Sequence, residues 1–371
     1  MQFQIKRDTL IKSLSIAHNI IERKNTIPIL SNVLLEIKKN VLNIVATDMD
    51  MVFRDEISDI KIDQEGSTTT SATVLYDLLR KLPTNLDVSF NLQSENKLNI
   101  KAKNSKFNLL CLPKDDFPNF ADTFETNPIN LNGKDFLSLL NKTKISMSND
   151  ETRHYLNGIF IHPTASNKSS YLTGVATDTH RLSSSSMAIK EEGNFKPFIL
   201  PKKTIFQLCN LLQENNENVS LYIGETKIQF KIGNSVLVSK VIDGKFPDYE
   251  KVVPKGNKKT LKVNAKDFIN SIERVITVSI DRKEGVKVTL EKENIQLFVA
   301  SSSSGEGNEI LPASFNSENL TISFNARYLL DIASAIEDEN LIMNLNDETS
   351  PALIQDMSDR QSYYVIMPMK I

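Results

Sequence analysis

The sequence lacks the features that mark disulfide-stabilised, membrane-spanning or exported proteins. Its two cysteines, Cys111 and Cys209, stand in apolar runs, which indicates buried, reduced thiols. No stretch approaches the roughly 18 consecutive apolar residues of a membrane span. Near the start, Lys6, Arg7 and Lys12 stand where an export signal needs an apolar run. We therefore expect a cytoplasmic protein with no membrane partner.

An excess of basic charge is also missing. The chain has 44 lysines and arginines against 46 aspartates and glutamates, for a net charge of -2. A protein with this balance can bind DNA only if its cations gather on one face. Its 40% apolar and 24% charged residues are ordinary for a folded protein and exclude a disordered or collagen-like chain.

What the sequence does contain is an internal repeat. Ala46-Thr47-Asp48 recurs as Ala176-Thr177-Asp178, and Phe117-Pro118-Asn119-Phe120 recurs as Phe246-Pro247-Asp248-Tyr249. A third strand-like run leads into Ala300-Ser301-Ser302. This spacing predicts three similar tandem domains. We place them at residues 1–122, 128–251 and 252–371.

A shorter period within each domain predicts two helices. Six segments show apolar residues at i, i+1 and i+4 after a polar start. The first apolar residues of these segments are Leu10, Leu75, Phe136, Ile205, Phe268 and Leu329. Four of the segments have a capping residue, namely Ser71, Asn132, Asn264 and Asn325.

Alternating β-branched runs between the helices predict antiparallel strands. They lie at residues 33–37, 88–92, 98–102, 219–223, 227–231 and 286–290. One helix with about four strands cannot bury the apolar face of the helix, so two such halves form a domain. The fold class is therefore α+β, with two helices packed on antiparallel sheets in each domain.

Cations recur in or beside the first helical turn, where a helix prefers acidic residues. They are Lys6, Arg7, Lys134, Lys202, Lys203, Lys266 and Arg327. A shared polyanionic partner would explain the recurrence; side chains that point into water would also explain it. Neighbouring helices are ~8–10 Å apart, so twelve helices from two chains would line about 110 Å of circumference and leave about 25 Å clear. Duplex DNA would pass through such an opening.

Several motifs, in this order, resemble the bacterial DNA sliding clamp family, the β subunit of the replicative polymerase. They are Pro28 to Asn32, Ala46 to Asp48, Arg153 to Gly158, Ala176 to Leu182, Phe246 to Tyr249 and Tyr364 to Ile371. The resemblance spans the whole chain. It implies a head-to-tail homodimer closed into a ring, with helices inside and sheets outside. Such a ring encircles duplex DNA and tethers the polymerase; it is loaded by an ATP-driven clamp loader and catalyses nothing.

The resemblance also implies functional residues. Nonspecific contact with duplex DNA falls on Lys24, Arg153, His154, Tyr155, Lys202 and Lys203. An outer pocket for short peptides of polymerases, the clamp loader and repair proteins falls on Leu156, Thr177, Thr179, His180, Arg181, Leu182, Pro247, Lys251, Val252, Val365, Ile366, Met367, Pro368 and Met369. The dimer interface falls on Phe107 and Val278, which ordinary core positions would explain equally well.

Two pocket positions depart from the family pattern. Thr179 stands where glycine is usual, which adds bulk and removes backbone freedom. Lys251 stands where arginine is usual, which removes bidentate hydrogen bonding. For the tail around Pro368, the alternative to a pocket wall is a last core strand.

Two other functions stay open. Asp178, His180 and the serines that follow could belong to a hydrolase, but no Gly-x-Ser-x-Gly elbow occurs. Asp48 repeats Asp178 without a histidine, which favours a turn-capping role for both. No metal-ligand spacing and no ATP-binding loop occur, so we expect no cofactor. The second alternative is a monomeric scaffold that binds peptides.

Overall fold

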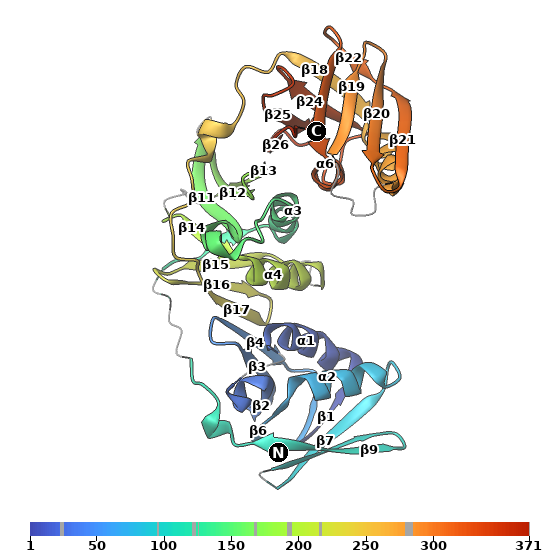
Figure 1. The fold of residues 1–371 in the computed structure, drawn as a ribbon. Helices are drawn as coiled ribbons and strands as arrows, with labels where there is room; N and C mark the ends of the chain where they lie inside the picture. Colours follow the sequence, from blue (N-terminus) through green and yellow to red (C-terminus); the bar gives the residue numbers. More distant parts are fainter. Residues whose placement is uncertain are drawn as a thin grey trace. The chain divides into compact units, whose positions relative to one another are not determined.

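The computed structural model describes residues 1–22, 26–94, 96–120, 124, 126–166, 169–190, 195–214, 217–278 and 285–370. The chain forms two compact units. Figure 1 labels many of their helices and strands. The first unit holds Met1–Leu137 and Lys203–Val241, and the second holds Ser138–Lys202 and Ile242–Ile371. Within the described ranges, no helix is long and apolar enough to cross a bilayer.

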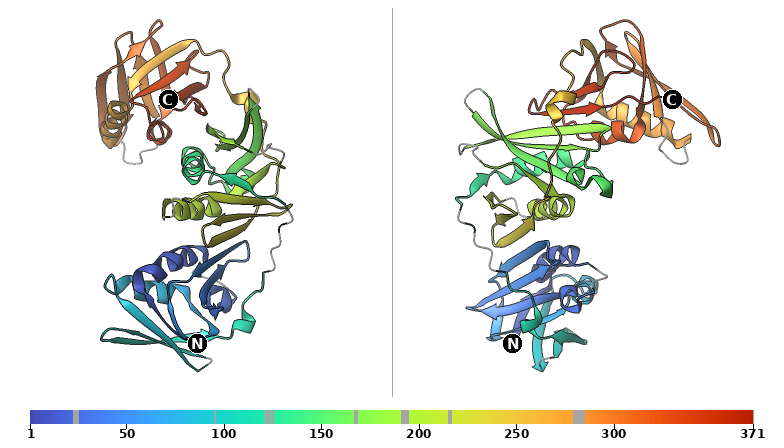
Figure 2. Two further views of the ribbon diagram at one scale, coloured as in Figure 1. Left: turned by 180° about the vertical axis from the view of Figure 1, so that it is seen from behind. Right: turned by 60° about the vertical axis from the view of Figure 1, so that its left-hand side comes forward.

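The six predicted α-helices are confirmed. They are α1 (Arg7–Ile20), α2 (Ala72–Lys81), α3 (Gly133–Lys144), α4 (Lys202–Glu214), α5 (Ala265–Val275) and α6 (Ala326–Ala333). Short 3-10 helices are η1 (Pro28–Ser31), η2 (Lys114–Asp116), η3 (Glu151–Leu156), η4 (Tyr249–Val252) and η5 (Ile276–Val278). Helix α1 lies beside α2, and α5 lies beside α6, as the two views of Figure 2 also show.

All four predicted helix caps are also confirmed. The side chains of Ser71, Asn264 and Asn325 each accept a hydrogen bond from a first-turn amide. The amide oxygen of Asn132 accepts bonds from the N–H groups of Lys134 and Asp135. Each cap satisfies backbone donors that have no partner inside the helix.

The first unit contains a 13-stranded antiparallel sheet. Its order is β10-β15-β16-β17-β4-β3-β2-β6-β9-β8-β7-β1-β5. The strands of the first domain are β1 (Gln2–Lys6), β2 (Asn32–Lys38), β3 (Val41–Thr47), β4 (Met51–Ile57), β5 (Lys61–Gln64), β6 (Gly66–Ser71), β7 (Asp87–Ser94), β8 (Lys97–Ala102) and β9 (Ser105–Leu112). The second domain adds β10 (Ile129–Leu131), β15 (Val219–Ile223), β16 (Lys227–Ile232) and β17 (Ser235–Lys240).

The second unit contains two sheets. The nine-stranded sheet has the order β14-β11-β12-β13-β26-β25-β24-β18-β22, and the four-stranded sheet has the order β21-β20-β19-β23. Strands of the second domain are β11 (Gly158–Ser166), β12 (Ser169–Thr177), β13 (Arg181–Ile189) and β14 (Phe198–Pro201). Strands of the third domain are β18 (Lys259–Asn264), β19 (Gly285–Leu290), β20 (Asn294–Ser301), β21 (Gly305–Pro312), β22 (Ser314–Phe315), β23 (Leu320–Asn325), β24 (Asn340–Leu345), β25 (Ala352–Asp356) and β26 (Ser362–Ile366).

Two strand pairs join consecutive domains, and we call them seams. In the first seam, β4 pairs antiparallel with β17, and Asp55 lies opposite Ser235. In the second seam, β13 pairs antiparallel with β26, and Ser185 lies opposite Ser362. Each seam lies within one unit, so the repeat seen in the sequence is also a repeat of domain-to-domain pairing.

Candidate functional site

The two Ala-Thr-Asp motifs form the same tight turn, one beside each seam. In the first turn, Asp48 Oδ1 accepts bonds from the amides of Asp50 (3.0 Å) and Met51 (2.7 Å). The Thr47 hydroxyl donates to the Met51 carbonyl at 2.8 Å. The predicted turn-capping role of Asp48 is therefore confirmed.

The second turn repeats this network. Asp178 Oδ1 accepts bonds from the amides of His180 and Arg181, both at 3.0 Å. The Thr177 hydroxyl donates to the Arg181 carbonyl at 2.7 Å. Thr179 has φ 78°, in the left-handed region that favours glycine, and Met49 has φ 76° at the same place in the first turn. The family glycine at position 179 thus has a physical reason, and this chain carries a strained threonine instead.

An apolar cluster lies beside the second turn. Its buried members are Leu156, Val175, Leu182, Ile199, Phe246 and Val365. It crosses the second seam, because Leu182 of β13 lies opposite Val365 of β26. Three predicted pocket residues are therefore neighbours, although Leu156, Leu182 and Val365 are each at most 3% exposed.

Three predicted pocket residues, which we call the exposed rim, are large apolar side chains at the surface. Val252 is 53% exposed, Met367 is 41% and Met369 is 36%. The Met367 amide donates to the His180 carbonyl at 2.9 Å, which holds the start of the tail against the second turn, and the Met369 amide donates to the Ser323 carbonyl of β23 at 2.7 Å. Ile366 is fully buried in the core of the third domain, so its side chain is not available to an external ligand. For Ile366, the alternative of a last core strand is therefore correct. The side chains of Met367 and Met369 remain accessible to solvent.

Three other predicted pocket residues also reach the surface. Pro247 and Lys251 are exposed, and Pro368 is half-buried. Lys251 pairs with Asp248 at 2.8 Å, and this carboxylate raises the lysine pKa. The Arg153 guanidinium donates to the Thr179 hydroxyl at 3.2 Å, so the threonine that replaces glycine gains a partner from η3.

The aromatic side of the cluster contains His162. Its Nδ1–H donates to the Pro163 carbonyl at 3.2 Å, which leaves Nε2 to accept from the Tyr249 hydroxyl at 3.0 Å. Phe160 stacks on both His162 and Phe246, with ring centroids 4.9 and 4.8 Å apart. Burial lowers the pKa of His162 below its ordinary 6.5, although the Pro163 carbonyl and the charge of Glu250 oppose the shift.

Four predicted DNA contacts lie together on and beside η3. Arg153, His154 and Tyr155 are consecutive, and Lys202 bonds with Asn149 just before η3. Arg153 also pairs with Asp150 at 2.8 Å, so its charge is partly neutralised within the protein. Lys24 lies outside the described residues.

The other first-turn cations differ in their exposure. Lys134 and Lys266 are exposed, and the side chain of Arg327 is 69% exposed. Arg7 instead donates to the carbonyls of Leu79 and Arg80 at the end of α2. Its bonds are therefore internal, and a polyanionic partner does not explain its position.

Lys203 also has internal bonds. Its ammonium group binds the Asp48 carboxylate of the first turn and the Ile20 carbonyl at the end of α1. The Asp48 side chain is only 7% exposed. Lys203 therefore joins α4 of the second domain to the first domain, which its predicted role as a DNA contact does not explain.

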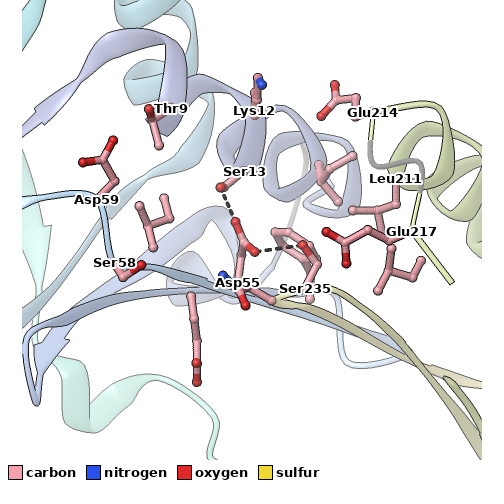
Figure 3. A pocket seen from close by; sticks show the side chains of 17 residues that line it. Thr9, Lys12, Ser13, Asp55, Ser58, Asp59, Leu211, Glu214, Glu217 and Ser235 are labelled. Atoms are coloured by element: carbon pink, nitrogen blue, oxygen red, sulfur yellow. Dashed lines mark hydrogen bonds between the residues drawn. The ribbon is translucent and has the colours of Figure 1, made fainter. Parts of the chain in front are cut away.

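An acidic cavity of about 470 Å³ lies beside the first seam (Figure 3). Asp55 accepts hydrogen bonds there from the hydroxyls of Ser13 on α1 and Ser235 on β17. Within the described ranges, no group of His, Cys, Asp and Glu side chains could hold a metal ion. The Asp55 carboxylate thus already has two protein donors. We therefore interpret the cavity as part of the structure of the first seam and not as a ligand site.

Among the strand edges left open in the described part of the chain, those of β9 and β21 carry exposed apolar residues. Strand β9 pairs with β8 along residues 105–110, but with β6 only through Cys111 and Leu112. Strand β21 is the outer strand of its sheet. Leu110 on β9 is 84% exposed and Ile310 on β21 is 63% exposed, both high for large apolar residues.

Both predicted interface residues lie by these edges. Phe107 is half-buried on β9. Val278 is half-buried at the end of η5, beside Gly307 of β21. Sequence reasoning missed Leu110 and Ile310, although an apolar residue at an exposed strand position was a usable signal.

The comparisons with known proteins cover the whole chain. Family models for the N-terminal, central and C-terminal domains of the DNA polymerase III beta subunit match residues 1–121, 130–248 and 250–370. The chain belongs to the bacterial β sliding clamp family. The Caulobacter vibrioides beta sliding clamp is 37% identical, and that of Escherichia coli K12 is 29% identical; both alignments cover all of each chain.

Solved clamp structures agree. A Caulobacter crescentus clamp matches with a TM-score of 0.94 and 37% identity, over 100% of this chain and 99% of that one. A Bartonella birtlesii clamp bound to griselimycin matches with the same score and identity, over 100% of both chains. The predicted fold of three similar clamp domains is confirmed. Since sliding clamps are processivity factors and not catalysts, the hydrolase alternative is excluded.

Proposed function

We propose that two copies of this chain close head to tail into a ring around duplex DNA and tether the replicative polymerase there. Domain boundaries at residues 1–122, 128–251 and 252–371 belong to this proposal, as does a cytoplasmic site of action at the nucleoid. The observation that carries it is the pair of free edges. Strands β9 and β21 occupy the places in the repeat that β17 and β4 occupy in the first seam.

The repeat supports a register for this third seam. In the hairpin of the first domain Thr47 pairs with Val52, and in that of the third domain Ser301 pairs with Gly305. Asn308, three residues after Gly305, therefore takes the place of Asp55. Ser105 begins β9 as Ser235 begins β17. Since Asp55 lies opposite Ser235, Ser105 of one copy is expected opposite Asn308 of the other.

Apolar exposure supports the same pairing. The register puts Lys106 opposite Gly307 and Phe107 opposite Glu306. It places Leu110 and Ile310 at the two ends of the seam, where burial would relieve an exposure that is costly in a monomer. A contact between different surfaces that closes by rotation gives a ring.

A cross-linking experiment tests the ring and its register. Opposed residues in an antiparallel pair have Cα atoms about 4.5–5.5 Å apart, which suits a disulfide. The variant Ser105→Cys, Asn308→Cys should oxidise to a two-chain product. The matched control Ser105→Cys, Ser303→Cys keeps two new thiols but misplaces one, and should not cross-link. A mass of one chain by light scattering, with no cross-link on or off DNA, would favour the monomeric scaffold.

The cations on and beside η3 support DNA contact. We propose that Lys24, Arg153, His154, Tyr155 and Lys202 face the duplex. Lys203, which was predicted to do the same, has its ammonium group bound to Asp48 and Ile20. Contacts between cations and phosphate are nonspecific and weaken with salt. In high salt, only a closed ring should therefore hold the clamp on nicked circular DNA through gel filtration. Cutting the circle should release the clamp. Retention on the linear form would contradict topological binding.

The apolar cluster and its exposed rim support peptide binding. We propose that polymerases, the clamp loader and repair proteins insert short apolar peptides between the second turn and the tail. Met367 and Met369 suit a lining that adapts to several clients. Removing residues 367–371 should abolish binding of the polymerase and leave the two-chain mass unchanged. A one-chain mass for this variant would instead make the tail a structural element.

A further inference from the structure

We propose that the two Ala-Thr-Asp turns are clasps that hold the seams inside the chain shut. Each clasp rests on contacts within a single unit of the chain.

The first clasp joins the first turn to α4. One oxygen of Asp48 caps the turn, and the other binds the ammonium group of Lys203 in the first turn of α4. Lys203 also donates to the Ile20 carbonyl at 2.6 Å, at the end of α1. A largely buried carboxylate and a helix C-terminus therefore hold one cation of the next domain.

The second clasp joins the second turn to α6 of the third domain through an arginine. One oxygen of Asp178 caps the second turn, and the other accepts a bond from Arg181 at 3.0 Å. The guanidinium then reaches α6 of the third domain, where it donates to Asp331 at 2.7 Å and lies 4.1 Å from the ring centroid of Tyr328. The Arg181 side chain is 9% exposed, so this charge is well shielded from salt.

Hydrogen exchange of the full-length two-chain protein tests the clasps. Asp48→Asn keeps an oxygen for the turn amides and removes the charge that holds Lys203. Amides of β4 and β17 should exchange about tenfold faster or more, because a bond to a charged group is lost. Amides of β13 and β26 should keep their rates. Asp178→Asn is the matched variant and should show the reverse pattern.

The variant Lys203→Met is the control for any change that Asp48→Asn causes in the first turn itself. It removes the ammonium group, leaves the first turn intact and should reproduce the exchange pattern of Asp48→Asn. Combining Asp48→Asn with Lys203→Met should raise the exchange rates little beyond either single variant, since the two residues act as one pair. Unchanged exchange at β4 and β17, or equal acceleration at both seams, would overturn the clasps.

Discussion

The first and second turns have the same backbone and different surroundings. Both cap themselves with an aspartate and a threonine, and both hold their third residue at positive φ. Around the first turn, the neighbouring apolar cluster comes from the first domain, with Ile29, Leu30, Leu34 and Phe117. Around the second turn, the cluster includes a residue from the next domain, Val365.

This difference shows how a repeat produces a binding site once. The turn is a scaffold, because its hydrogen bonds need only the Thr-Asp pair and the backbone. The site depends on what the next domain brings to the seam. At the second seam the next domain ends in β26 and an exposed methionine tail; at the first seam it continues from β17 into the rest of the chain.

The largest expected effect compares Leu182, in the apolar cluster beside the second turn, with Val52, its counterpart beside the first turn. Leu182→Ala should lower the free energy of unfolding by about 2–5 kcal/mol, since it opens a cavity in a buried cluster. Val52→Ala, at the same place in the first seam, should lower it less. Urea unfolding measures both changes. Only Leu182→Ala should lose polymerase binding, and equal loss in both variants would end the distinction between the seams.

A smaller effect concerns the strained third residue of each turn. Met49→Gly relieves a positive φ and should raise the free energy of unfolding by roughly 1 kcal/mol or less. Thr179→Gly relieves a greater strain, because threonine is β-branched, but it also loses the bond from Arg153, so its gain should be no larger than that of Met49→Gly. Thermal unfolding gives the comparison. A larger gain at position 179 would mean that the Arg153 contact does not offset the extra strain.

A third test compares the proposed third seam with the clasped ones. Lys106→Glu should weaken the two-chain form about two- to fivefold in low salt, and this effect should vanish near 1 M salt. The neutral variant Lys106→Gln should weaken it less. Sedimentation over a dilution series measures both variants. Equal affinity of the two variants and the unaltered protein would argue against a role of this charge at the third seam.

The smallest effect is a pH dependence confined to the second domain. His162 is neutral in both states above pH 6.5; below it the unfolded chain takes up a proton first, because burial lowers the folded-state pKa. Stability should therefore fall as pH drops from 6.5 through the lowered pKa. His162→Gln should flatten the unfolding curve in this window. An unchanged slope would place the titration elsewhere.

Much of the fold could be predicted from the sequence because its signals are local. Apolar periodicity predicts the six helices and the six strand segments named above. Side chains that bond their own first helical turn predict the four caps. The role of Asp48 followed from its repetition without a histidine. For the candidate site, the neighbours Leu156, Leu182 and Val365 came from family resemblance, since no local pattern links them.

Other features could not be predicted because their partners are remote in the chain. Asp55 and Ser235 are 180 residues apart, and Lys203 and Asp48 are 155 apart. A lysine in a first helical turn has the same local sequence signal whether it faces DNA or holds another domain. Ile366 belongs to an apolar tail by sequence and to the core of the third domain by structure.

Local sequence is enough to predict the helices, the strands and the self-capped turns, because each depends on interactions between residues close in the chain, and the threefold repeat is visible in the sequence directly. Which cations have protein partners, which strand edges stay open and where an apolar cluster crosses a seam follow from the folded chain alone. These depend on which distant surfaces meet, and the energy of a charge or an apolar side chain changes with its burial.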